Sequence, residues 1–410
     1  MTTLQVLEHQ RLRIGERRSA DELVLGDKEA TLLERLLPAL PAGICRWEHR
    51  AVRFTQHCGV ICLGSTVIEV LPKIAGKEQE PGACRDALIG MLNESRELQP
   101  ATAGNGPVRM QRAVLLDAFV LAFCRELEVQ LAQGLLRQYV SHVENLPVIR
   151  GKLRVELQLK HNSVHRERLY CEYDELSPDM PLNRVIKGVL QRLSKLPLGA
   201  RALKHVRELL LRFDGVADVV PSAKMLDAIV VNRTMARYES VLRQCRWFLE
   251  GIYPDVTVGA NVAAALLFDM NKLFESCVTR AAQRIARGRG LRLHAQGPMK
   301  WFARDAATDK QLFAMKPDMT LSDADGTVLL VADAKWKLLD EAEAKWGVAE
   351  ADMYQLAAYA ARYGATQAAL IYPKQSSFSV TRALGLHKPA LRVQLVPFDV
   401  VTRSFHGLSV

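Results

Sequence analysis

Two acidic residues and one lysine lie at the ends of two short strands that the sequence predicts near the C-terminus. The segment KPDMTLSDADGTVLLVADAK (316–335) is typical of a β-hairpin, with an Asp-Gly turn before a strongly apolar strand. Side chains two apart on a strand share a face, so Asp333 and Lys335 project together from the strand end. If the strands pair, Asp318 converges on Asp333. Two carboxylates predict a Mg²⁺ site for phosphodiester hydrolysis, with Lys335 orienting the water or offsetting transition-state charge.

Neighbouring helices offer further polar side chains to this site. Asp352, Gln355 and Tyr359 follow a helical spacing that places them on one face of a predicted helix. Glu275, on an earlier helix, adds another carboxylate. An isolated Asp-x-Lys pair is more often a surface ion pair of little energetic value. The order Pro-Asp, hairpin, Asp-x-Lys and then Gln-x-x-x-Tyr favours a functional site over that simpler reading.

The elements around these residues predict a small α/β domain with a mixed sheet. Apolar periodicity predicts the following order of elements: a helix at 267–287, a strand at 291–296, the hairpin, a helix at 349–363 and a strand at 367–373.

The preceding 255 residues divide into two further regions. Residues 1–105 are β-rich, and a Gly- and Pro-containing stretch at 99–107 predicts a linker or long loop. Residues 113–146 have helical apolar spacing. The alternating segments 151–159 and 168–176 predict a protruding β-hairpin with a basic tip, followed by helices to about residue 250. We therefore expect three domains, 1–105, 106–255 and 256–410.

The overall composition is that of a globular protein with a basic surface. The 410 residues carry a net charge of +10, which favours a polyanionic partner such as nucleic acid, although a basic solvated surface explains it equally well. No signal peptide or membrane span is recognisable, and the eight dispersed cysteines resemble reduced thiols, so we expect a cytoplasmic protein. His57, Cys58 and Cys62 lack a matching second pair, which favours core packing over a zinc site.

Several motifs together resemble a known family. PD…DAK with its flanking elements is similar to the PD-(D/E)xK nuclease superfamily, and QLAAY is similar to the Gln-x-x-x-Tyr motif of its RecB-like branch. GVICLGSTVIEVLPKI, VIRGKL, YDELSPDMPLNRVIK, FDMNKLFE, KPD, DAKWK and LIYP occur in the order of McrC-like proteins, from about residue 50 to 400. These are nuclease subunits of GTP-dependent, modification-directed restriction systems. The first fifty residues match no motif.

The resemblance implies a fold and a set of site residues. The fold is α/β multidomain, with a β-rich and helical N-terminal partner-docking region and a C-terminal PD-(D/E)xK, restriction-endonuclease-like mixed-sheet domain. The implied metal is Mg²⁺, with Mn²⁺ as an alternative. The residues that match the family's motif are Asp318 and Asp333 as metal-binding acids, Lys335 as the catalytic lysine, Gln355 and Tyr359 as the accessory helix motif, and Glu275 as a further catalytic, metal-binding acid.

The resemblance also implies partners. McrC-like chains dock on a hexameric AAA+ GTPase, McrB, which binds GTP and reads methylated double-stranded DNA. The sequence GxxxxGK[ST], typical of a phosphate-binding loop, is missing from this chain, which agrees with that division of labour. We expect the 151–176 hairpin to enter the ring pore. Its candidate contacts are Arg150, Lys152, Lys160, His161, His165 and Arg166.

The expected function is that of an endonuclease subunit in a GTP-dependent, methylcytosine-directed restriction complex, which also stimulates the partner's GTPase. Two alternatives remain open at this point. One is a catalytically silent adaptor that regulates the GTPase, which the presence of Asp318, Asp333 and Lys335 disfavours. The other is a stand-alone RecB-like DNA nuclease, which the large N-terminal region disfavours.

Overall fold

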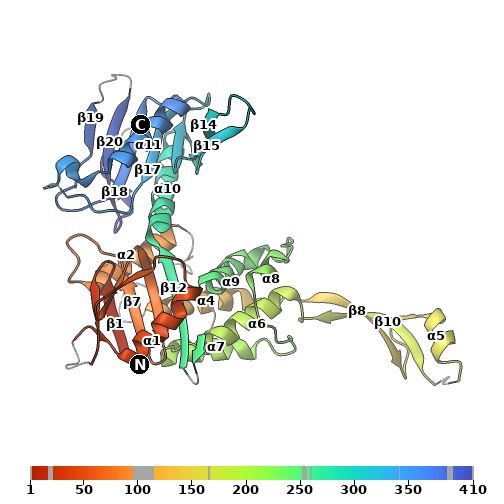
Figure 1. Cartoon of the computed structure of the whole chain (residues 1–410). Coiled ribbons are helices and arrows are strands. Elements are labelled where there is room, and N and C mark those ends of the chain that lie inside the picture. Colours follow the sequence, from red (N-terminus) through yellow and green to blue (C-terminus); the bar gives the residue numbers. More distant parts are fainter. Residues whose placement is uncertain are drawn as a thin grey trace. The chain divides into compact units, whose positions relative to one another are not determined.

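The chain forms two compact units, described here from a computed structural model (Figure 1). One unit combines Met1–Leu115 with Gly251–Val410, and the other is Leu116–Glu250. The structure describes residues 2–16, 22–95, 115–164, 167–251, 256–258, 261–340, 342–385 and 391–408.

The N-terminal part of the first unit contains two sheets. The five-stranded sheet has the order β1 (Thr2–Leu7), β7 (Thr66–Leu71), β6 (His57–Leu63), β12 (Asn261–Asp269) and β11 (Val256–Val258). The four-stranded sheet has the order β3 (Val24–Leu25), β2 (Arg11–Ile14), β5 (Ala51–Phe54) and β4 (Cys45–Glu48). The accompanying helices are α1 (Asp27–Leu36), the short 3-10 helix η1 (Leu37–Ala39) and α2 (Pro81–Glu94).

Strands β6 and β7 are buried at every position, which explains their nearly continuous apolar sequences. β6 pairs antiparallel with both β7 and β12. Gly59 of β6 has a φ of +146°, and a Cβ added there would lie 2.1 Å from the carbonyl oxygen of Leu266. Only glycine allows the β12 backbone to approach so closely.

Helix α10 (Met270–Gly288) continues from the end of β12 into the C-terminal part of the same unit. The carboxylate of Asp269 caps the helix by accepting a hydrogen bond from the backbone N–H of Asn271 at 2.9 Å. α10 contacts α2 of the N-terminal part as well as β13 and β17 of the C-terminal part. The helix therefore connects the two sheets directly.

The C-terminal part is built on a seven-stranded mixed sheet. Its order is β13 (Arg292–Ala295), β16 (Met319–Ser322), β17 (Val328–Ala334), β18 (Gln367–Pro373), β20 (Arg392–Asp399) and β19 (Arg382–Gly385), with β21 (Ser404–Phe405) paired to β20. A separate ribbon consists of β14 (Lys300–Arg304) and β15 (Gln311–Met315). The predicted α/β domain with a mixed sheet is thereby confirmed.

Helix α11 (Glu350–Tyr363) connects the parallel strands β17 and β18 and packs on both. A parallel pair requires such a crossover, because its strands run in the same direction. The 3-10 segment η3 (Ala344–Gly347) precedes the helix. Gly364 ends the helix with a left-handed φ of +72°, and the N–H of Ala365 then bonds to the carbonyl of Ala360 at 3.0 Å.

The second unit is a helical body with an antiparallel arm. Its elements are α4 (Leu115–Leu131), β8 (Gln138–Leu146), β9 (Lys152–Leu153), α5 (Val155–His161), β10 (Leu169–Ser177), α6 (Pro181–Leu193), α7 (Ala200–Leu211), α8 (Ala223–Asp227), the 3-10 helix η2 (Ala236–Tyr238) and α9 (Glu239–Gly251). Figure 1 shows β8 and β10 projecting from the helices and carrying α5 at their far end. We call residues 138–177 the arm.

The prediction of a helix from 113 to 146 is wrong in its second half. Helix α4 ends at Leu131, Gly134 adopts a φ of +82°, and residues 138–146 form β8. β8 pairs along its full length with β10, from Leu146 opposite Leu169 to Gln138 opposite Ser177. The left-handed glycine ends the helical path, and the long-range pairing then determines the extended conformation.

The predicted strand at 151–159 is also wrong, although an antiparallel arm does project there. Only Lys152–Leu153 are extended, and α5 follows. The side chain of Gln158 on α5 accepts from the N–H of Tyr170 and donates to the carbonyl of Arg168, at 2.8 Å each. Its amide thus satisfies backbone groups at the start of β10 and just before it, in the way that a neighbouring strand would.

The predicted boundary at residue 256 differs from the observed organisation. Strands β11 and β12, assigned to the C-terminal domain, belong to the N-terminal sheet, and the two parts form one compact unit. The reason is the pairing of β12 with β6, which lies about 200 residues earlier in the chain and leaves no local signal.

All eight cysteines are free thiols, and Cys58 and Cys62 are buried on β6 together with His57. Core packing of this trio, rather than zinc binding, is consistent with their burial. Among the described residues, no helix has the length and hydropathy needed to cross a membrane.

Candidate active site

Asp318 and Asp333 come together where β16 begins and β17 ends. Met319 lies opposite Ala332 in the antiparallel pair, which brings the residue before β16 alongside Asp333. One carboxylate oxygen of Asp318 accepts a hydrogen bond from the backbone N–H of Ala334 at 2.7 Å. The predicted convergence of the two carboxylates is therefore present in the structure.

Asp333 is buried and Asp318 is half-buried, and both resist ionisation. Burial, followed by the charge of Asp333, raises the pKa of Asp318 to about 7. Burial also raises the pKa of Asp333, although the hydrogen bond and positive charge of Lys335 oppose this effect. A cation placed between them would relieve their repulsion.

Lys335 is the positive group in contact with this pair. Its Nζ lies 2.5 Å from an oxygen of Asp333 and 3.7 Å from an oxygen of Asp352. Burial alone would lower the pKa of Lys335, but the hydrogen bond and negative charge of Asp333 outweigh burial and raise it. The amine therefore carries a proton at neutral pH.

Helix α11 supplies a polar chain that holds this lysine. Lys335 Nζ donates to Gln355 Oε1 at 3.4 Å, and Gln355 Nε2 donates to the hydroxyl oxygen of Tyr359 at 3.0 Å. The Tyr359 hydroxyl in turn donates to the carbonyl of Lys316 at 3.5 Å. The helix face predicted from Asp352, Gln355 and Tyr359 thus points toward the strand ends.

Glu275 of α10 is near enough to influence the two aspartates electrostatically. Burial raises the pKa of Glu275, and the charge of Asp333 raises it further. Its carboxylate accepts a hydrogen bond from the side-chain amide of Gln296, whose backbone N–H donates to the carbonyl of Asp318 at 2.7 Å. Gln296 was not predicted, because it lies in a loop whose sequence has no motif.

The donor set suits a magnesium ion that completes its coordination with water and substrate. Among the described residues, no three His, Cys, Asp or Glu side chains form a cluster that could hold a metal by themselves. Magnesium in proteins is usually bound by one or two carboxylates together with water and substrate phosphates. The adjacent carboxylates of Asp318 and Asp333 meet this requirement, whereas a direct ligand role for Glu275 finds no support in this geometry.

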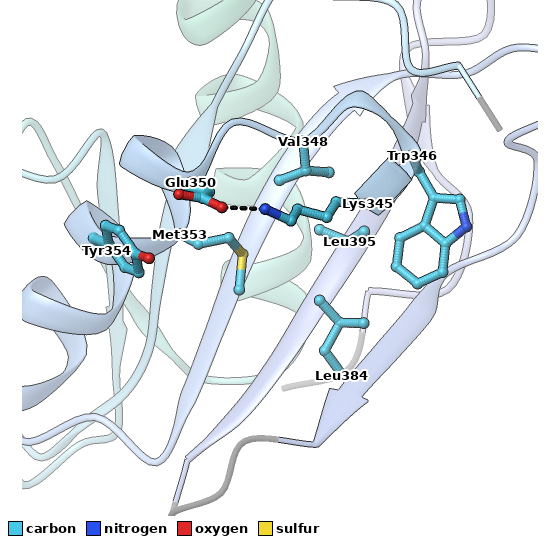
Figure 2. A pocket seen from close by; sticks show the side chains of 8 residues that line it. All are labelled: Lys345, Trp346, Val348, Glu350, Met353, Tyr354, Leu384 and Leu395. Atoms are coloured by element: carbon cyan, nitrogen blue, oxygen red, sulfur yellow. Dashed lines mark hydrogen bonds and ion pairs between the residues drawn. The ribbon is translucent and has the colours of Figure 1, made fainter. Parts of the chain in front are cut away.

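A separate pocket of about 560 Å³ lies on another face of α11 (Figure 2). Figure 2 shows Met353 of α11 and Leu384 on two sides of it, with Tyr354 and Trp346 at opposite ends, and Leu395 also lines it. The remaining lining residues are Val348 and the ion pair of Lys345 with Glu350. No lining residue belongs to the group around Lys335, so this apolar pocket is not the candidate active site.

The predicted docking residues lie in the arm. Arg150 stacks over the ring of Tyr173 at 4.0 Å, and Lys152 is exposed on β9. Lys160 and His161 are exposed at the end of α5. The predicted contacts His165 and Arg166 lie outside the described residues.

The arm also exposes many apolar side chains. The exposed apolar residues along it are Tyr139, Val143, Val148, Ile149, Val155, Leu159, Val164 and Leu176. Such a concentration on a projecting element is typical of a protein-binding surface. Sequence reasoning identified the basic residues here and missed the apolar ones.

Comparison with solved structures defines the class of fold. A chain of the refined half-complex from the tetradecameric assembly of Thermococcus gammatolerans McrB AAA+ hexamers with bound McrC superimposes with a TM-score of 0.73 and 17% identity, covering 100% of this chain and 97% of that one. A chain of the cryo-EM structure of the Thermococcus gammatolerans McrBC complex gives a TM-score of 0.54 and 18% identity, covering 69% and 88%. This protein therefore has the mixed α/β, multi-sheet fold found in those assemblies.

The family follows from the sequence itself. The model of the McrBC family, described as McrBC 5-methylcytosine restriction system component, matches residues 52–373. The chain belongs to this family. No curated protein matches the chain.

Proposed function

We propose that this chain is the magnesium-dependent endonuclease subunit of a GTP-dependent, methylcytosine-directed DNA restriction complex. The observation that carries the proposal is the convergence of Asp318, Asp333 and Lys335 at adjacent ends of β16 and β17. Two adjacent carboxylates with little exposure to solvent, beside a protonated amine, suit the hydrolysis of a phosphodiester. The hairpin that bears them, followed by the α11 crossover, supports a PD-(D/E)xK type of nuclease domain.

In this proposal Asp318 and Asp333 hold the metal. When bound, Mg²⁺ supplies charge neutralisation of the phosphate and a water of lowered pKa. The backbone N–H of Ala334 fixes one oxygen of Asp318 and leaves the other available. Glu275 adds negative charge nearby without being required as a direct ligand.

Lys335 acts as a fixed positive charge beside the reacting phosphate. Its raised pKa keeps it protonated, so it can stabilise negative charge that develops in the transition state. Gln355 accepts a hydrogen bond from Lys335, and Tyr359 accepts one from Gln355. These two residues restrict the orientations of the amine and act as positioning residues.

We further propose that the arm docks this chain on a hexameric AAA+ GTPase. One structural neighbour comes from an assembly of McrB AAA+ hexamers with bound McrC, and its match extends over this whole chain. The arm combines exposed apolar residues, which mark protein-binding surfaces, with Arg150, Lys152, Lys160 and His161. GTP would bind to the partner. The arm would stimulate the partner's hydrolysis of GTP.

The decisive experiment measures plasmid cleavage by this chain together with its GTPase partner. Methylated and unmethylated plasmids are incubated with Mg²⁺, with and without GTP. Wild type is compared with Asp333→Ala and with the matched control Asp325→Ala, an exposed acid in the turn of the same hairpin. We expect cleavage to require methylation, GTP and Asp333, and to survive the control substitution.

Other outcomes would point to a different function. GTPase stimulation by wild type and Asp333→Ala, with no cleavage by either, would favour an adaptor that regulates the ring. Cleavage by the isolated chain without GTP would favour a stand-alone nuclease.

A further inference from the structure

The ribbon of β14 and β15 exposes an aromatic pair. Phe302 is 62% exposed and Phe313 is 70% exposed. Trp301 lies opposite Ala314 and Ala303 lies opposite Leu312 in the antiparallel register, so Phe302 and Phe313 occupy the positions between these two pairs. Two large apolar rings at neighbouring positions, both open to solvent, form an exposed patch of the kind that marks a binding site.

The backbone of this ribbon is strained at one of the two rings. Phe313 has a φ of +58°, in the left-handed region that bulky side chains rarely adopt. Strain of this kind persists only where the surrounding structure enforces it, and it is concentrated at functional sites. The conformation therefore favours a binding role for the ribbon over an incidental exposure of Phe313.

The base of the ribbon is attached to the candidate active site. The Tyr363 hydroxyl donates to the carbonyl of Met315 at 3.0 Å, and the Tyr359 hydroxyl donates to the carbonyl of Lys316 at 3.5 Å. Asp318 follows two residues later. These hydrogen bonds link the base of the ribbon to α11, the helix that also contacts Lys335 in the candidate site.

The charge of the ribbon suits a polyanion. Residues 299–316 include four basic and two acidic residues. The carboxylate of Asp309 is paired with Arg304 at 2.9 Å. Lys310, just before β15, and Lys316, just after it, are both exposed. An element with aromatic rings between exposed cations has the two components that nucleic-acid binding uses, stacking or apolar contact with bases and charge on phosphates.

We propose that the β14–β15 ribbon holds duplex DNA beside Asp318 and Asp333. Phe302 and Phe313 contact the bases, and Lys310 and Lys316 contact phosphates. The inference rests on the proposed nuclease function and names the element that positions its substrate. Figure 1 shows the ribbon standing out from the sheet that carries β17. A two-stranded ribbon has the width that the major groove of B-DNA admits.

The test measures DNA affinity separately from cleavage. The full-length chain carrying Asp333→Ala binds a fluorescein-labelled, unmodified duplex in a fluorescence anisotropy titration over a range of salt concentrations. Three further variants are made in this background: Phe302→Ser with Phe313→Ser, Lys310→Ala, and the control Trp47→Ala. Trp47 is a 42% exposed aromatic residue on β4, in a different sheet.

The two kinds of contact predict different signatures. Loss of the rings should weaken binding about 10-fold and leave the slope of log affinity against log salt unchanged, because no phosphate contact is lost. Lys310→Ala should weaken binding and reduce that slope by about one counterion. Trp47→Ala should bind as the parent does. If the double variant fails to fold, Phe302→Ala alone repeats the test, since Phe302 has no left-handed φ.

Each contrary result has a distinct meaning. Unchanged affinity of the double variant and of Lys310→Ala would overturn the inference, while wild-type cleavage would still support the nuclease. A shift from dimer to monomer in light scattering, without a change in DNA affinity, would assign the aromatic pair to a second copy of the chain instead. If the Asp333→Ala chain has no DNA affinity with or without its GTPase partner, and wild type does not cleave, the proposed function itself fails.

Discussion

The indole N–H of Trp336 donates to both carboxylate oxygens of Glu8, at 3.0 Å each. Glu8 follows β1 at the start of the chain, and Trp336 directly follows Lys335. The backbone N–H of Lys73 also donates to Glu8 at 2.9 Å. The carboxylate thus joins the N-terminal sheet to the segment that leaves the candidate active site.

The burial of Glu8 predicts a pH-dependent stability, although the hydrogen bonds from Lys73 and Trp336 oppose its effect on the pKa. Burial raises the pKa of Glu8 to about 7, against 4.5 for the free side chain, so the folded protein holds this proton more tightly than the unfolded chain does. The contribution to stability is complete below the unfolded pKa. This contribution is lost as pH rises through the folded pKa. The total loss in the free energy of unfolding is about 3 kcal/mol.

Replacing Glu8 with glutamine, which is neutral at every pH, should remove this dependence. Thermal unfolding at about pH 5 and about pH 8 should show the melting temperature of Glu8→Gln rising relative to wild type at the higher pH. Glu78→Gln, at an exposed acid, is the control and should follow wild type at both pH values. Parallel pH profiles for Glu8→Gln and wild type would contradict the assignment.

Local sequence patterns predicted the strands that carry the candidate site. The apolar run ending in Asp333-Ala-Lys335 and the Pro-Asp before the turn predicted β16 and β17, and both are confirmed. Alternation then placed Asp333 and Lys335 on one face, and antiparallel pairing brought Asp318 to them. The catalytic roles of these residues remain predictions.

What the sequence could not predict depends on contacts between distant segments. Glu8 contacts Trp336 across 328 positions, and β12 pairs with β6, so neither leaves a periodic signal nearby. In the arm, the alternating sequence VELQL predicts a strand, but Gln158 bonds to the backbone of β10 and α5 forms instead. Tertiary hydrogen bonds outweighed local propensity there.

Replacing Lys335 with alanine should abolish cleavage and preserve metal binding. The amine contacts Asp333 and competes with a cation for that carboxylate, so its removal should leave the affinity for Mn²⁺ unchanged or increased. Cleavage should fall by about 100-fold or more, the usual cost of losing one preorganised charge at a transition state.

Mn²⁺ titration calorimetry and a plasmid nicking assay on the same preparation would check both parts of this expectation. Lys272→Ala, at an exposed lysine of α10, serves as the control for a general loss of charge. Cleavage by Lys335→Ala at the wild-type rate would refute the role of the amine. Loss of metal binding in this variant would show that its defect lies in the site as a whole.

Replacing Tyr359 with phenylalanine tests the positioning role of α11. The ring packs in a buried cluster with Val331 and Tyr363, so the melting temperature should change little. The hydroxyl that accepts from Gln355 is lost, and the Gln355–Lys335 contact loses its support. We expect cleavage to fall about 10-fold through the maximal rate, with DNA affinity unchanged.

Gln355→Glu provides the matching comparison. A carboxylate at this position still accepts from Lys335 but cannot donate to Tyr359, so it separates the two hydrogen bonds. Retained activity in Gln355→Glu together with reduced activity in Gln355→Ala would assign the effect to the Lys335 contact. If Tyr359→Phe and Gln355→Ala are both as active as wild type, neither residue belongs to the proposed site.

Reversing charge on the arm should uncouple this chain from the proposed GTPase partner. Lys152 on β9 and Lys160 on α5 are both exposed and lie on the element proposed to enter the ring. Lys152→Glu with Lys160→Glu replaces attraction by repulsion at a partner surface that accepts basic groups. We expect stimulation of GTP hydrolysis to fall about 10-fold or more, since like charges brought together at an interface cost several kcal/mol.

The same variant should keep its fold and its intrinsic DNA affinity, because both lysines belong to the Leu116–Glu250 unit, whereas Asp318 and Asp333 belong to the other unit. Lys195→Glu, at an exposed lysine that follows α6 in the helical body, is the control for charge reversal outside the arm. GTPase assays with increasing amounts of each variant distinguish weaker docking from lower maximal stimulation. Full stimulation of GTP hydrolysis by the double variant, at the concentrations that suffice for wild type, would exclude these two lysines from the docking contact. The exposed apolar residues of the arm would then be the remaining candidates.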